Sequence, residues 1–187
     1  KHLFAKSVHR PLTGTALAIS SVEGESPALL LIVLDLGWWL RHADAEALRE
    51  RILRELELPE ANVIIHLTHT HAGPVLDSDA PPESNPQAVR DYMEQLANSC
   101  VQGGRAALAN QETATTLFRT GRCGLATQRD LIDPDKPDRY LTGFNPDVPA
   151  DDTLLTALSL DEEGKALATL INYACHPTKL AWDNTAI

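Results

Sequence analysis

Two short stretches of the sequence carry histidines at a spacing suited to binding a metal ion. The first is Thr-His-Thr-His-Ala-Gly-Pro at positions 68–74, and the second is Asn-Tyr-Ala-Cys-His-Pro-Thr at positions 172–178. Imidazole is the commonest metal ligand among side chains, and a catalytic zinc ion keeps one position open for water. His69 and His176 are therefore candidate ligands of a single zinc ion.

Each motif follows an apolar run that predicts a β-strand. Residues 62–67 lead into the first motif and residues 168–174 into the second, and a proline closes each motif. In an extended chain, side chains two residues apart share a face and lie about 6 to 7 Å apart. His71 is then either a third ligand or a neighbour of the metal that polarises a substrate carbonyl.

The hydrophobic pattern predicts further strands and two long helices. The strands are expected at 3–8, 15–20, 28–35, 113–119, 154–160 and 166–174, and the helices at 44–56, capped by Asp44, and at 86–109, capped by Asn85. The run at 28–35 is apolar on both faces, which indicates a central strand covered on both sides. Residues 122–152 lack periodicity and predict a long loop that is either a functional cover or disordered.

These elements predict a mixed β-sheet with helices packed on it, in the α/β or α+β class. In such folds ligand sites gather beyond the carboxyl ends of the strands, which is where His69, His71 and His176 fall. The 187 residues are enough for one domain with a sizeable core.

Composition limits the classes of partner. The chain has 16 basic and 26 acidic residues and a formal charge of −10, which disfavours nucleic acid. No stretch approaches the roughly 20 apolar residues of a transmembrane helix. The three cysteines lack metal-binding spacing and are expected to be buried free thiols. Composition therefore disfavours a nucleic-acid partner and leaves a small-molecule or lipid substrate open.

Three segments resemble motifs of the neutral/alkaline non-lysosomal ceramidase family, and they occur along the chain in the same order as in that family. Residues 68–74 resemble its T-H-T-H-S-G-P motif, and residues 172–178 are similar to its second histidine motif, a strand that ends in H-P-T. Residues 124–130 resemble a family segment that ends in N-R-S. Ala72 in place of serine, and Gln-Arg-Asp at 128–130, make the match closer to the family's uncharacterised relatives than to true ceramidases.

The resemblance implies a zinc-dependent hydrolase that cleaves the amide bond of a ceramide-like N-acyl lipid. It implies that His69 and His176 bind zinc, and that His71 and Arg129 face the substrate and stabilise the oxyanion. The family completes its zinc sphere with a glutamate and a tyrosine farther along the chain, so residues 1–187 are expected to be an inactive fragment of a catalytic domain. The alternative is a non-catalytic metal- or ligand-binding module of the same fold.

Other candidate residues have two interpretations each. Asp35, after its predicted strand, either lines a site or caps a turn. Trp38 and Trp39 either offer apolar surface to an acyl chain or pack in the core. Arg129 either faces the substrate, as the motif resemblance implies, or forms an ordinary salt bridge. The remaining histidines are interpreted as ordinary surface or core residues: His2, His9, His42 and His66.

Overall fold

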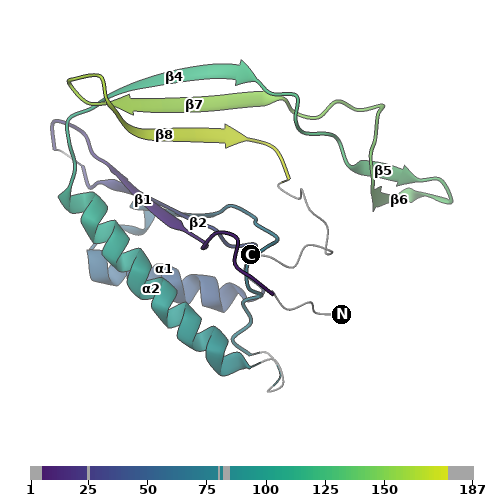
Figure 1. Ribbon diagram of the computed structural model, residues 1–187, viewed down its shortest axis with the longest axis horizontal. Helices are drawn as coiled ribbons and strands as arrows, with labels where there is room; N and C mark the ends of the chain where they lie inside the picture. Colours follow the sequence, from purple (N-terminus) through teal and green to yellow (C-terminus); the bar gives the residue numbers. More distant parts are fainter. Residues whose placement is uncertain (1–5, 25, 80, 82–84, 177–187) are drawn as a thin grey trace. The chain divides into compact units, whose positions relative to one another are not determined.

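A computed structural model describes residues 6–24, 26–79, 81 and 85–176 (Figure 1). The strands are β1 (Gly14–Ile19), β2 (Leu29–Leu34), β3 (Val63–Leu67), β4 (Thr115–Arg122), β5 (Asp130–Asp133), β6 (Lys136–Thr142), β7 (Thr153–Leu160) and β8 (Ala166–Tyr173). The helices are α1 (His42–Leu56) and α2 (Pro86–Ala109), with one 3-10 turn, η1 (Glu60–Asn62). This content confirms the predicted mixed class of helices and sheets.

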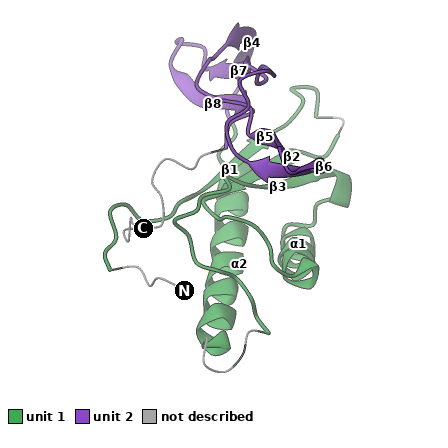
Figure 2. Cartoon of the chain, turned by 90° about the vertical axis from the view of Figure 1, so that its right-hand side faces the viewer, with its two compact units in different colours: residues 1–111, 177–187 green, residues 112–176 purple. Residues whose placement is uncertain are grey.

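Two compact units divide the chain, and Figure 2 colours them separately. The first contains the described residues up to Gln111, and the second runs from Glu112 to His176. The expectation that the chain is one domain stays a prediction.

The first unit is built on a three-stranded sheet in the order β1-β2-β3. β1 pairs with β2 antiparallel, whereas β2 and β3 are parallel and α1 lies between them in the chain. The register pairs Leu34 with Leu67, the last residues of the two parallel strands. The segments that follow β2 and β3 therefore leave the sheet at the same edge.

The core of this unit lies between one face of the sheet and the two helices. Alternate β2 residues Leu30, Ile32 and Leu34 are buried there, together with Ile52 of α1 and Val101 of α2. The intervening β2 residues are only half-buried. β2 is the central strand of the sheet, as predicted. The prediction that both its faces are covered is wrong for the described residues of this unit, because both helices pack against the same face of the sheet.

Helix α2 begins and packs as its sequence predicts. The Asn85 side chain accepts a hydrogen bond from the Ala88 amide, and Pro86 occupies the first turn. An added Cβ at Gly104 would lie 2.6 Å from a Leu56 methyl group and 3.1 Å from a Leu30 methyl group, so these side chains would have to shift. This glycine therefore lets α2 approach α1 closely.

The predicted cap of α1 is wrong. The N-cap residue is Arg41, whose side chain makes no capping bond. Asp44 lies in the first turn, and its Oδ1 accepts a hydrogen bond from Ser78 Oγ at 2.8 Å. The tertiary partner has thus replaced the local capping interaction.

The second unit holds a three-stranded antiparallel sheet in the order β4-β7-β8, and β7 and β8 form the predicted hairpin. A second hairpin, β5–β6, occupies part of the segment that was predicted to lack structure. That prediction is wrong because the hairpin is not marked by apolar periodicity: Asp133 is 2% exposed and forms an ion pair with the exposed Arg139.

Three smaller expectations can be compared with the described residues. The strand expected at 3–8 lies partly outside them, and its described part contains one isolated bridge residue, Ser7. Cysteines 100, 123 and 175 are free, with the first buried and the others half-buried. Among the described helices, none has the length and apolar character to cross a membrane.

Candidate metal centre

The first histidine motif leaves the sheet through a turn. β3 ends at Leu67, and His69 adopts the left-handed backbone conformation with φ of 59°. The expectation that the strand stays extended to His71 is therefore wrong, and side-chain alternation does not place the two rings. The turn nevertheless brings the imidazoles of His69 and His71 edge to face, with centroids 5.0 Å apart.

Asp35 anchors the motif to the neighbouring strands. Its Oδ2 accepts hydrogen bonds from the Thr13 amide at 3.0 Å and from Thr13 Oγ1 at 2.7 Å. Its Oδ1 accepts from Thr68 Oγ1 at 3.2 Å, and the Thr68 amide donates to the Leu34 carbonyl at 3.0 Å. Asp35 thus anchors Thr68, which directly precedes His69.

The carbonyl of Gly37 orients the ring of His69. It lies 3.1 Å from His69 Nδ1. A carbonyl oxygen can only accept a hydrogen bond, so this contact requires a proton on Nδ1, and in the neutral ring Nε2 is then the nitrogen that can bind a metal. A backbone carbonyl in this position is a typical outer-shell partner of a metal-ligating histidine. The contact therefore presents Nε2 as the ligand atom.

Gly37 is required by the same close approach. An added Cβ at this position would lie 2.9 Å from the carbonyl oxygen of Thr70, which is too close for any real side chain. The two backbone segments that leave the parallel strands therefore touch at Gly37, and this contact sets the position of its carbonyl.

Trp38 contacts both imidazoles. The indole centroid lies 5.6 Å from His69 and 5.4 Å from His71, distances typical of interacting aromatic rings. Its side chain is still 46% exposed, whereas Trp39 packs against the core. The sequence predicts that Trp38 either offers apolar surface to an acyl chain or packs in the core, and it does not predict the contact with the histidines. The feature of the sequence that could have indicated this contact is the pair of apolar strands before and after α1, because their carboxyl ends meet at one edge of the sheet.

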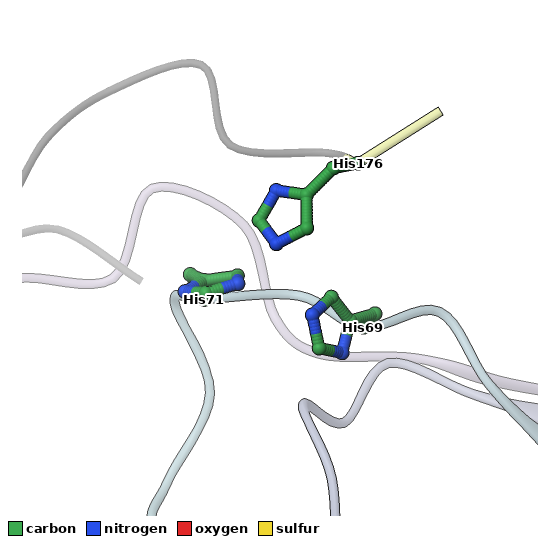
Figure 3. Close-up of side chains that lie close together, drawn as sticks. All are labelled: His69, His71 and His176. Atoms are coloured by element: carbon green, nitrogen blue, oxygen red, sulfur yellow. The ribbon is translucent and has the colours of Figure 1, made fainter. Parts of the chain in front are cut away.

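Figure 3 shows the imidazoles of His69, His71 and His176. They make a group that could hold a metal ion, with one ligand nitrogen of each within 4.8 Å of the others. The donor set fits zinc, since imidazole nitrogen suits this ion and three histidines are one known set for a catalytic zinc. His69 and His176 are half-buried, whereas His71 is exposed.

In the second unit, Tyr173 ties the second histidine motif to the segment that leads to Arg129. Its hydroxyl donates to the Cys123 carbonyl at 2.7 Å and accepts from the Ala126 amide at 2.7 Å. Desolvation raises the pKa of this hydroxyl. Arg129 itself is exposed and directly precedes β5. Its assignment to the substrate stays a prediction.

Two solved structures are similar to the chain. One is the neutral ceramidase from Pseudomonas aeruginosa, at 16% sequence identity and a TM-score of 0.60, and the other is a ceramidase complexed with C2, at 17% and 0.62. Each match covers 88% of this chain but only 26% of the ceramidase. No protein-family model matches the sequence, and no curated protein matches it. At these identities the likeness shows a shared fold, which supports the resemblance at that level.

Proposed function

We propose that this chain carries part of the active site of a zinc-dependent hydrolase that cleaves amide bonds in N-acyl substrates of the ceramide type. In this proposal His69 and His176 are zinc ligands, and His71 and Arg129 face the substrate. The observation that carries the proposal is the three-histidine group, together with the Gly37 carbonyl that directs Nε2 of His69. The fold shared with ceramidases supports the reaction class.

A bound zinc ion would lower the pKa of a coordinated water to about 7 and so supply a nucleophile for the amide carbonyl. The protein's own groups have separate tasks. Nε2 of His69 and one nitrogen of His176 would hold the ion. The exposed ring of His71 can reach a substrate and donate a hydrogen bond to the oxygen that becomes negative, and the guanidinium of Arg129 would add positive charge to the same place.

Zinc content measured at equal protein after zinc loading and desalting tests the metal site. We expect the wild type to retain zinc, and His69→Ala and His176→Ala to bind it at least tenfold more weakly, because each removes one of few ligands. His66→Ala is the matched control, since His66 is an exposed residue of β3. A wild-type protein that takes up no zinc, or single variants that retain it unchanged, would refute the shared site.

The alternative of a non-catalytic binding module is separated by turnover. In the family that the motifs resemble, a glutamate and a tyrosine complete the zinc sphere, so the hydrolase proposal expects zinc-dependent release of amine from N-acyl substrates by a protein that carries both ligands. Zinc binding without turnover in a protein that includes them would favour the binding module.

A further inference from the structure

A small cavity of about 70 Å³ opens beside His71 in the first unit. Its walls come from the two segments that leave the parallel strands, namely residues 37–40 and 70–76. The cavity is therefore built from the same backbone contact that orients His69. It adjoins the ring that is proposed to face the substrate.

The walls of this cavity are mainly apolar. Trp38, Leu40, Val75 and Leu76 line it, and His71 is its one imidazole. A water molecule needs only about 10 to 15 Å³ of such volume, so the cavity has room for a group of several carbon atoms. Apolar walls with one polar group at the side are typical of pockets that hold an alkyl group and orient a neighbouring polar atom.

We propose that this cavity is a subsite for the alkyl part of an acyl group, with Trp38 as the wall that contacts the substrate. The inference rests on the proposed function, and it adds the place at which the acyl carbons bind. With its alkyl part between Trp38 and Val75, a substrate would carry its carbonyl beside the His71 ring. A wholly polar ligand would lose hydration against these walls without gaining partners.

A metal-free test uses short amides as probes. We expect hexanamide to shift the indole N–H signal of Trp38 in a nitrogen–proton NMR spectrum with a saturating dose dependence. The signal is assigned by its loss in Trp38→Phe. Each methylene that becomes buried strengthens binding about fourfold. Hexanamide should therefore bind at least about tenfold more tightly than acetamide. Burial of about two of its additional methylenes is enough for this difference.

Val75→Phe should fill the cavity and weaken hexanamide binding at least fivefold. Val75 is 59% exposed, so the larger side chain is tolerated by the fold. Val22→Phe is the matched control, because Val22 is 86% exposed and lies outside the cavity lining. The subsite is refuted if hexanamide leaves the Trp38 signal unmoved, or if Val75→Phe binds it as the wild type does. Because no metal is used, these results are independent of the zinc measurement, and either proposal can fail alone.

Discussion

Replacing Gly37 by alanine tests the contact that orients His69. The added Cβ would start 2.9 Å from the Thr70 carbonyl oxygen. Ordinary carbon–oxygen contacts in proteins are about 3.3 to 3.6 Å, so the two segments must separate by about 0.5 Å. The Thr70 atom belongs to the backbone, and the position of the Cβ is fixed by the backbone of residue 37, so no side-chain rotation can relieve the clash.

The separation would break the orienting hydrogen bond. A shift of about 0.5 Å takes the distance between Gly37 O and His69 Nδ1 from 3.1 Å to about 3.6 Å, beyond a hydrogen bond. Loss of an outer-shell partner of this kind typically weakens metal binding about 10- to 100-fold. Forcing an atom into a packed contact also costs about 1 to 3 kcal/mol of folding free energy.

The assay is a zinc titration against a competing chromophoric chelator, with urea unfolding of the same samples. Gly121→Ala is the matched control, because its added Cβ meets no atom within 4 Å and its backbone is not left-handed. We expect weaker zinc binding and lower stability in Gly37→Ala, with neither change in the control. If Gly37→Ala binds zinc with wild-type affinity although its stability has fallen, the carbonyl does not control the ligand and the reasoning is wrong.

Two further predictions concern the anchor at Asp35 and the buried thiol of Cys100. Asp35→Ala removes the acceptor of the hydrogen bonds from Thr13 and Thr68. The free energy of unfolding, measured in urea, should therefore fall by about 2 kcal/mol. A change within about 0.5 kcal/mol of zero would contradict the anchoring role. Burial raises the pKa of the Cys100 thiol from its ordinary value of 9.0 to about 11. The folded state therefore favours the neutral thiol, and this contribution is complete below about pH 9 and lost as the pH rises toward 11. Between pH 7.5 and 10.5 the wild type should lose about 2 kcal/mol more stability than Cys100→Ala, and equal losses would contradict the prediction.

The strands and helices with strong local signals were predictable. Strand β2 and the hairpin β7–β8 follow clear apolar patterns, and α2 carries the asparagine and proline that begin helices. The hairpin β5–β6 does not follow from its sequence pattern, because its ion pair joins the exposed Arg139 to the buried Asp133, and a charged residue such as Asp133 is expected on a surface. The N-terminus of α1 was misassigned because Ser78, 34 residues away in the chain, takes the Asp44 side chain.

The candidate site was predictable in its residue types and less so in its geometry. The histidine motifs identify the imidazoles, but the pairing of His69 and His71 was attributed to strand alternation, which does not apply after β3 ends. The contacts of Gly37 and Trp38 with His69 arise from tertiary approach of two segments about 30 residues apart in sequence. A parallel pairing of their parent strands was the one feature from which this approach could have been inferred.

The left-handed torsion at His69 has a consequence for protein engineering. Transferring the seven residues of the first motif to the end of an ordinary strand would not reproduce the paired imidazoles, since the recipient backbone would keep the rings in line along its own axis. A successful graft must also bring a glycine whose carbonyl meets the first ring, and a partner strand running in the same direction to carry it. The transferable unit is therefore a pair of adjacent strand ends, and the histidine sequence alone is not enough.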